Sequence, residues 1–139
     1  VKKGAKEAIR KLKKEGIKKT VMLTGDRALV AENICAELGI DEVHAELLPD
    51  QKVSLLEKII ENKTGNGKVV YVGDGINDAP VIKKATVGVS MGNIGSDAAI
   101  EASDVVLMKD NLMKIKEVIN ISKFTKKKII CFMKKICQK

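Results

Sequence analysis

Apolar residues follow two different periods along this chain, and segments of one period alternate with segments of the other. In the longer segments the apolar residues lie three or four positions apart among lysines and glutamates, which is typical of helices with one face against a sheet. The shorter segments are aliphatic runs without polar alternation, which are typical of parallel strands covered on both faces. This alternation predicts an α/β fold, a doubly wound parallel sheet with right-handed crossovers.

The predicted elements fill most of residues 3–108. Predicted helices cover residues 3–15, 27–38, 49–62, a short segment after residue 80, and 96–102, and predicted strands cover residues 20–23, 42–48, 69–72, 86–92 and 105–108. The helical pattern of 27–38 turns Leu29, Val30, Ile34 and Leu38 toward the sheet. The run 69–72 is expected to lie buried on both faces, and the last strand is expected at an edge.

The chain from Leu112 onward is one long helical pattern, with apolar residues on one side and most lysines on the other. A basic amphipathic helix of this kind can lie on an anionic membrane surface or lead into a membrane segment, and it can equally be a solvated terminal helix. No apolar run approaches the roughly 20 residues that a membrane-spanning helix needs. We therefore expect two parts, a domain over residues 1–111 and a basic helix over 112–139.

Length and composition narrow the class of protein. A chain of 139 residues is enough for one domain, and with 2% aromatic residues its core must be aliphatic. The net charge of +8 is concentrated at the two ends, in residues 1–19 and 123–139, so the middle of the chain is acidic. No nucleic-acid partner is expected, because no aromatic residues are interleaved with the terminal lysines. The three cysteines form no CxxC, so we expect free thiols and no zinc site.

The densest chemical motif follows the run 69–72 and reads Gly-Asp-Gly-Ile-Asn-Asp-Ala-Pro over residues 73–80. Its glycines permit a tight turn, which places Asp74 and Asp78 at the carboxyl edge of the predicted sheet, where open α/β folds bind ligands. Two carboxylates and the nearby Asn77 amide form an oxygen-rich site that suits Mg²⁺. The alternative is an acidic turn that only caps the following helix.

A second strand also ends in a small polar motif, Thr24-Gly25-Asp26. Thr24 can hydrogen-bond a phosphoryl oxygen beside the Gly25 amide, with Asp26 as the N-cap of the next helix; alternatively Thr24 and Asp26 only cap that helix. Lys52 lies in the first turn of the helix that starts near Pro49, where its charge opposes the helix dipole. It can therefore be placed to meet a transferring phosphoryl group, or it can be a surface lysine.

The only histidine, His44, lies in the predicted strand 42–48. An acid–base histidine is usually oriented by a neighbouring group, and the local sequence offers His44 no such partner. We therefore expect His44 to have no role as a ligand or as an acid–base group.

Taken in order, Thr24-Gly25-Asp26, Lys52 and the motif at 73–80 resemble the phosphorylation domain of P-type cation-transporting ATPases, which belong to the haloacid dehalogenase-like superfamily. The similarity runs over about residues 1–128 and includes Leu47-Leu48-Pro49 and the segments 91–92 and 95–97. Among the subclasses the sequence is most similar to the heavy-metal pumps, particularly the zinc/cadmium/cobalt branch.

The resemblance implies a role for each motif residue. Thr24 and Gly25 would bind the phosphoryl group, Lys52 would neutralise its charge, and Asn77 would support the phosphate. Asp74 would bind Mg²⁺, with Asp78 in the metal shell and Asp26 completing the threonine motif. These roles agree with the residue chemistry, because a phosphoryl group needs a positioned cation, a metal and amide donors more than a general base.

The chain departs from the family in what it lacks. It has no Asp-Lys-Thr-Gly-Thr nucleophile motif, no nucleotide-binding domain that would bring ATP, no actuator domain and no membrane domain. We therefore expect a fragment of an ATP-driven metal pump that is inactive alone. The parent would lie in the cell membrane with this segment cytoplasmic, and the isolated chain would be soluble or peripheral.

The missing upstream segment also bears on the fold. In the family the nucleophile strand lies between the strands that correspond to 20–23 and 69–72. Without it, backbone groups of those two strands would lack partners, so we expect marginal stability or self-association. Two other functions stay open from the sequence, namely part of a soluble haloacid dehalogenase-like phosphatase and a non-catalytic basic module that binds membranes or nucleic acid.

Overall fold

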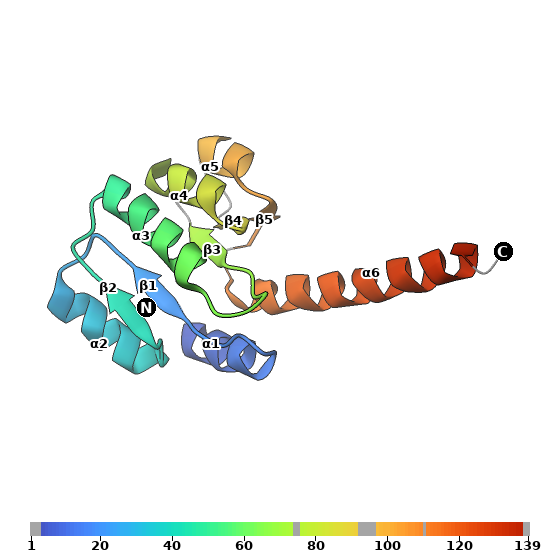
Figure 1. The fold of residues 1–139 in the computed structure, drawn as a ribbon. Coiled ribbons are helices and arrows are strands. Elements are labelled where there is room, and N and C mark those ends of the chain that lie inside the picture. Colours follow the sequence, from blue (N-terminus) through green and yellow to red (C-terminus); the bar gives the residue numbers. More distant parts are fainter. Residues whose placement is uncertain (1–3, 74–75, 92–96, 110, 138–139) are drawn as a thin grey trace.

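A computed structural model describes residues 4–73, 76–91, 97–109 and 111–137 of the chain, together with the side chains of most of them (Figure 1). Helices and strands alternate up to β5, as the hydrophobic pattern predicts. The elements are α1 (Ala5–Lys14), β1 (Val21–Leu23), α2 (Ala28–Leu38), β2 (Glu42–His44), α3 (Pro49–Asn62), β3 (Val70–Gly73), the 3₁₀ turn η1 (Ile76–Asp78), α4 (Ala79–Lys84), β4 (Val87–Met91), α5 (Asp97–Ala102), β5 (Val105–Leu107) and α6 (Met113–Cys137).

All of the strand pairs are parallel, which confirms the predicted fold class. Among the described residues the strands form two sheets, β1–β2 and β3–β4–β5, with β5 at an edge as expected. The single continuous sheet that the pattern suggests is therefore divided. In the described part of the chain β1 pairs only with β2 and β3 only with β4, so β1 and β3 are not paired with each other.

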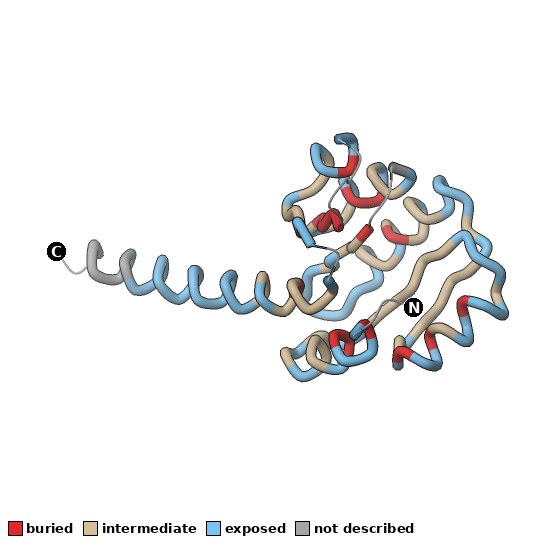
Figure 2. Tube along the Cα trace, turned by 180° about the vertical axis from the view of Figure 1, so that it is seen from behind, coloured by how far each residue is buried: buried red, intermediate tan, exposed pale blue. Residues whose placement is uncertain are grey.

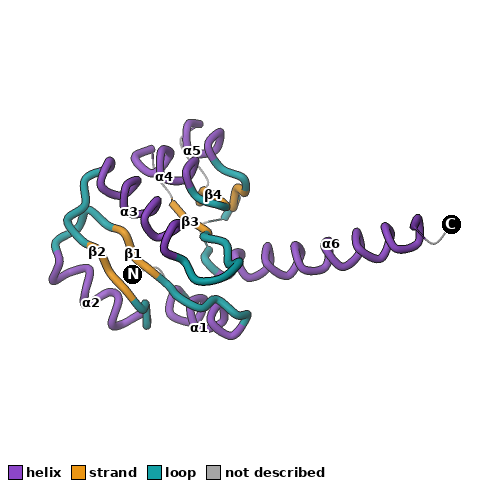
Figure 3. The backbone as a smooth tube through the Cα atoms, viewed as in Figure 1, coloured by secondary structure: helices purple, strands orange, loops and turns teal. Residues whose placement is uncertain are grey.

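Helices cover the strands from two sides (Figures 1 and 3). On one side α4 contacts β3 and β4 and is flanked by α3 and α5. On the other side α1 contacts both α2 and α6. The main core lies beneath α6, where Val89, Met91 and Leu107 from the sheet pack with Ile115. This doubly covered arrangement exposes the carboxyl ends of the strands, where the two polar motifs lie.

The strand β3 is less buried than its apolar sequence predicts. Val70 is 42% exposed, and Tyr71 and Val72 are only partly buried. The physical reason is that, among the described strands, β3 pairs with β4 alone, so no described strand on its other edge contributes side chains that would cover it. The expectation of burial on both faces over 69–72 is therefore wrong for this part of the chain.

The inward face of α2 agrees with the prediction at Ile34 and Leu38 and differs from it at Leu29 and Val30. Leu29 and Val30 are exposed, at 71% and 48%, while Ala31, Cys35 and Leu38 are buried. The buried residues are four and three positions apart and form the narrower face of the helix, where Cys35 Sγ lies 3.6 Å from Met22 Sδ of β1. The small side chains of Ala31 and Cys35 let the helix approach the strands closely. For this reason their face packs on the strands, and the bulkier face with Leu29 and Val30 is exposed.

The long helix α6 changes character along its length. Its first turns pack on the sheet through Ile115, Val118 and Ile119, whereas every side chain described from residue 120 onward is exposed (Figure 2). Glu15 at the end of α1 binds Lys116 at 3.3 Å and Lys123 at 3.1 Å, and these lysines lower the pKa of Glu15. The helix is therefore fixed to the domain as far as Lys123. The boundary at residue 111 stays a prediction.

No described helix is long and apolar enough to cross a membrane.

The carboxylate of Asp41, which follows α2, forms hydrogen bonds with Thr20, just before β1, and with Lys13 of α1. Asp41 accepts hydrogen bonds from Lys13 Nζ at 2.6 Å and from both the backbone N and Oγ1 of Thr20, at 2.8 and 2.7 Å. These donors, Lys13 first, hold the pKa of Asp41 well below its usual range. Because the folded-state pKa is the lower one, the stabilisation is complete above the unfolded-state pKa and is lost as pH falls below it.

We expect Asp41→Asn to destabilise the chain at neutral pH and to flatten the decline of stability on acidification below about pH 4. Urea unfolding at a series of pH values measures this, with the exposed Asp50, which takes part in no such network, replaced by Asn as control. An unchanged acid slope in Asp41→Asn would contradict the assignment.

Candidate phosphoryl and magnesium site

The Thr24 motif forms a loop held by backbone bonds to the segment that follows β2. Thr24 N donates to His44 O at 3.0 Å, Leu47 N donates to Thr24 O at 3.0 Å, and Glu46 N donates to Asp26 O at 2.9 Å. A Cβ on Gly25 would lie 3.3 Å from Leu47 O, so a small residue fits this close approach. The loop is thus fixed by neighbouring backbone, with Gly25 and Asp26 exposed.

The side chains of the motif bond to each other. Thr24 Oγ1 donates to Asp26 Oδ2 at 2.8 Å and accepts from Asp26 N at 3.1 Å. Asp26 is therefore not the N-cap of the next helix, which was the prediction; the N-cap position is Arg27, without a side-chain cap bond. The Asp26 carboxylate orients the Thr24 hydroxyl and does not cap the helix.

Lys52 is not a surface lysine. Its Nζ lies 3.1 Å from Asp78 Oδ1, and the two side chains are 16% and 15% exposed. The first turn of α3 positions it: Leu48 N donates to the capping oxygen Gln51 Oε1 at 2.8 Å, and Lys52 N donates to Leu48 O at 3.0 Å. A cation in the first turn of a helix is unfavourable for the helix dipole, and the partly buried carboxylate of Asp78 offsets this.

The Asp78 side chain packs closely against Gly73 at the carboxyl end of β3. A Cβ on Gly73 would lie 2.7 Å from the Asp78 Cβ and 3.0 Å from its Oδ2, so only glycine admits Asp78 here. Tyr71, two residues earlier on the strand, donates its hydroxyl to Asp78 Oδ1 at 3.0 Å. The sequence interpretation did not include Tyr71, although the two-residue period of a strand places it on the face of Gly73.

The structure brings some of the predicted residues together and leaves others outside its description. Lys52 and Asp78 are in contact, and the backbone bonds of Leu47 and Leu48 join the Thr24 loop to the helix that carries Lys52. Asn77 is exposed in η1. Asp74, the expected Mg²⁺ ligand, and the adjacent Gly75 lie outside the described residues.

The described residues contain no group of three or more His, Cys, Asp or Glu side chains that could hold a metal ion. Mg²⁺ does not require one, since it usually takes one or two protein carboxylates and fills its other positions with water and phosphate oxygens. The Asp78 carboxylate, beside a lysine that can bind phosphate, is a donor set that fits this requirement.

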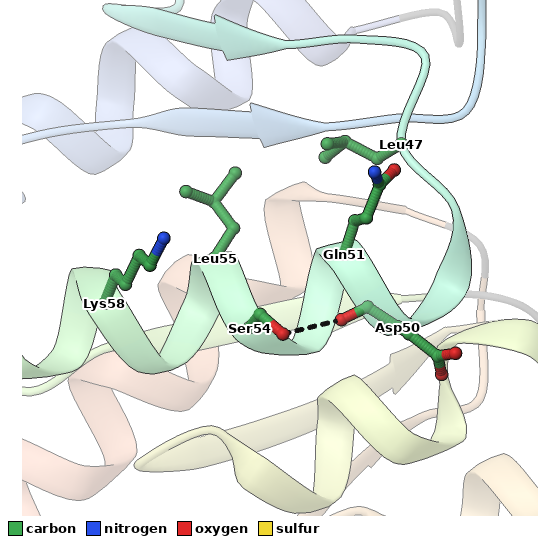
Figure 4. A pocket seen from close by; sticks show the side chains of 6 residues that line it. All are labelled: Leu47, Asp50, Gln51, Ser54, Leu55 and Lys58. Carbon is green, nitrogen blue, oxygen red and sulfur yellow. Dashed lines mark hydrogen bonds between the residues drawn. The ribbon is translucent and has the colours of Figure 1, made fainter.

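A shallow hollow of about 340 Å³ lies along α3 (Figure 4). Leu47 and Leu55 line it together with Asp50, Gln51, Ser54 and Lys58. Thr24, Lys52 and Asp78 are not among its lining residues, so the hollow is separate from the site that the motifs form.

His44 has a partner after all. Its Nε2 lies 2.5 Å from Glu42 Oε1, and Glu42 also binds Lys19. Lys19 and then His44 lower the pKa of Glu42. The expectation that nothing orients His44 is wrong, because residues 42 and 44 project from the same face of β2.

Residues 1–86 match the family described as hydrolase, haloacid dehalogenase-like hydrolase. The chain belongs to that family. The match covers β1, the Thr24 loop, Lys52 and Asp78, so it includes the described residues of the candidate site. The resemblance drawn from the motifs is thereby confirmed at the level of the superfamily.

Curated relatives extend the similarity to metal pumps. The chain is 48% identical over 130 residues to the zinc-transporting ATPase of Synechocystis sp., and 49% identical over 127 residues to the cadmium, zinc and cobalt-transporting ATPase of Bacillus subtilis. These alignments cover 94% and 91% of this chain, and the chain spans only 18% of the length of each relative. The predicted zinc/cadmium/cobalt branch is therefore confirmed as the group of its strong relatives.

Solved structures agree with the curated relatives. A zinc-transporting PIB-type ATPase in the E2.Pi state superposes with a TM-score of 0.79 at 38% identity, over 90% of this chain and 20% of that chain. A 3-deoxy-D-manno-octulosonate 8-phosphate phosphatase from Moraxella catarrhalis superposes with a TM-score of 0.69 at 20% identity, over 93% of this chain and 75% of that chain. The second likeness shows the fold alone, so phosphatases are distant neighbours of this chain.

Proposed function

We propose that residues 1–139 are part of the phosphorylation domain of an ATP-driven heavy-metal cation pump. In this proposal the chain supplies the phosphoryl-binding and magnesium-binding side of an aspartyl-phosphate site. The contact between Lys52 and Asp78 carries the proposal, because it brings the cation of one motif to the carboxylate of another, 26 positions apart. The identity of 48% to a zinc-transporting ATPase supports the choice of pump over phosphatase.

Each site residue has a task in this proposal. Thr24, its hydroxyl oriented by Asp26, and the Gly25 amide bind phosphoryl oxygens, and Lys52 neutralises their charge as it develops in the transition state. Asn77 adds an amide donor from η1. Asp74 and Asp78 would hold Mg²⁺, which when bound neutralises phosphoryl charge. Together they provide the positioning and electrostatics on which phosphoryl transfer depends.

The nucleophile would come from outside residues 1–139. The division of the described strands into the sheets β1–β2 and β3–β4–β5 supports this, since a further parallel strand could join the two. We infer that an upstream segment of the pump supplies that strand with an aspartate at its carboxyl end. ATP would reach the aspartate through a nucleotide-binding domain, and α6 would connect residues 1–111 to a membrane domain, with this segment on the cytoplasmic side. Self-association of the isolated chain stays a prediction.

Calorimetry tests the proposal. The chain is titrated with Mg²⁺ and beryllofluoride or phosphate, alone and mixed with a synthetic peptide that carries an Asp-Lys-Thr-Gly-Thr strand and no tyrosine. Binding that requires the peptide and is lost in Asp74→Ala supports an incomplete aspartyl-phosphate site. Binding by the chain alone that is lost in Asp74→Ala supports a preformed pocket at the same place. No binding in either mixture, or binding that Asp74→Ala leaves intact, contradicts the proposed function.

A further inference from the structure

The only tyrosine of the chain touches the candidate site, and no motif accounts for it. Tyr71 Oη donates to Asp78 Oδ1 at 3.0 Å, and Lys52 Nζ binds the same oxygen at 3.1 Å. Both donors therefore converge on one oxygen of the carboxylate. The other oxygen, Oδ2, is turned toward Gly73, 3.0 Å from the point where a Cβ on that glycine would lie.

Strand geometry explains this arrangement. Residues 71 and 73 project from the same face of β3, since side chains alternate along a strand. The missing side chain at Gly73 leaves room for Asp78, and the long phenol of Tyr71 reaches the same carboxylate from two positions earlier. The three groups fit only in this combination: a bulkier residue at 73 would displace Asp78, and a phenylalanine at 71 would lack the donor.

The proposed function gives Lys52 two partners. It holds Asp78 in the structure described above, and it is required to meet the phosphoryl group during the reaction. When its ammonium turns to phosphoryl oxygens, the bond to Asp78 weakens. Tyr71 is neutral and has no charge to offer the phosphoryl group, so its hydroxyl is the donor that can keep Asp78 in place while Lys52 is engaged.

We propose that Tyr71 is a positioning residue that fixes the Asp78 carboxylate for Mg²⁺ by donating its hydroxyl to Oδ1. This inference rests on the proposed role of Asp78. Hydrogen-bond partners of ligating carboxylates typically contribute about 10-fold or more to metal affinity. Loss of the hydroxyl should therefore weaken Mg²⁺ binding without removing a metal ligand.

The composition of the chain supplies a direct readout. The chain has one tyrosine and no tryptophan, so its tyrosine fluorescence reports on residue 71 alone. Hydrogen bonding to a carboxylate quenches tyrosine emission, and cation binding to that carboxylate changes the quenching. Mg²⁺ alone is the probe, added to the chain with and without the peptide described above, and its affinity is measured in parallel by calorimetry.

Two variants and a control complete the experiment. Tyr71→Phe should bind Mg²⁺ about 10-fold more weakly than the wild-type chain, and Asp78→Ala should lose the binding. Ser54→Ala removes an exposed hydroxyl that, among the described residues, donates to Asp50 O within α3, and it should leave the affinity unchanged. In the wild-type chain, Tyr71 emission should change with the same Mg²⁺ midpoint as the calorimetric signal.

The outcomes separate the two proposals. Mg²⁺ affinity that is lost in Asp78→Ala but unchanged in Tyr71→Phe overturns the role of Tyr71 alone. Affinity that survives Asp78→Ala overturns the proposed role of Asp78 itself. Wild-type emission that does not respond to Mg²⁺ also overturns the role of Tyr71. If Tyr71→Phe fails to fold, as judged by circular dichroism, the wild-type emission decides between the two results.

Discussion

Replacing Lys52 with methionine is expected to weaken binding of beryllofluoride or phosphate to the peptide-completed site by about 100-fold. The methionine keeps the length and apolar stem of lysine but has no charge to place beside the anion. It also leaves the partly buried Asp78 carboxylate with one donor fewer, since Lys52 Nζ and Tyr71 Oη share its Oδ1. Calorimetry of the variant measures the loss directly.

Lys58→Met is the matched control, because Lys58 lies on the same helix, is exposed and lines the separate hollow on α3. It should bind the anion as tightly as the wild-type chain. If both variants lost affinity equally, the effect would belong to the general positive charge of α3, and the specific role of Lys52 would be wrong.

The largest effect on stability is expected at Gly88 in β4. A Cβ there would lie 2.4 Å from Ile82 O and 2.7 Å from Ile82 Cγ2, so alanine would push α4 away from the sheet. Because Ile82 is almost completely buried, that shift would disturb the packing between α4 and the sheet. We expect Gly88→Ala to lower the free energy of unfolding by about 3 kcal/mol, at the upper end of typical overpacking costs.

Gly67→Ala is the control for that change. Gly67 lies in the connection before β3, and a Cβ there would have no neighbour within 4 Å. Its free energy of unfolding should be unchanged or slightly raised, since alanine restricts the unfolded chain. Urea unfolding followed by circular dichroism at two or more protein concentrations compares the variants. Equal stability of Gly88→Ala and the wild-type chain would show that α4 does not pack on β4 as described.

The sequence predicts the order and type of the elements well because these depend on local patterns. Buried strands such as β4 need aliphatic runs, and helices such as α3 need apolar residues at helical spacing. The face of α2 was not predictable in the same way. Its sequence offers two apolar stripes, and the choice of the one with Ala31 and Cys35 depends on how closely the strands can approach.

The site is predictable in its parts but not in its contacts. Thr24, Lys52 and Asp78 are found from their motifs, since their residue types suit a phosphoryl group and Mg²⁺. The contact of Lys52 with Asp78 joins distant segments, and the bond from Tyr71 depends on the close approach at Gly73. Likewise, the role of Asp26 depends on the loop geometry, which directs its carboxylate to the Thr24 hydroxyl instead of the following helix.

The division into two sheets was also not predictable, because it too depends on contacts between distant segments. Strand pairing is set by segments far apart in the chain, so hydrophobic runs alone do not say which strands are neighbours. The separation of β1 from β3 nevertheless agrees with an account in which a further strand lies between them. That further strand would bring the nucleophile to Thr24, Lys52 and Asp78.

Amide hydrogen exchange of residues 21–23 and 70–73 tests this claim most directly, with the chain alone, with the Asp-Lys-Thr-Gly-Thr peptide, and with a scrambled peptide of the same composition. A strand inserted between β1 and β3 would pair with both of them, so slower exchange is expected in both segments with the first peptide only. Unchanged exchange, or equal protection by the scrambled peptide, would contradict it.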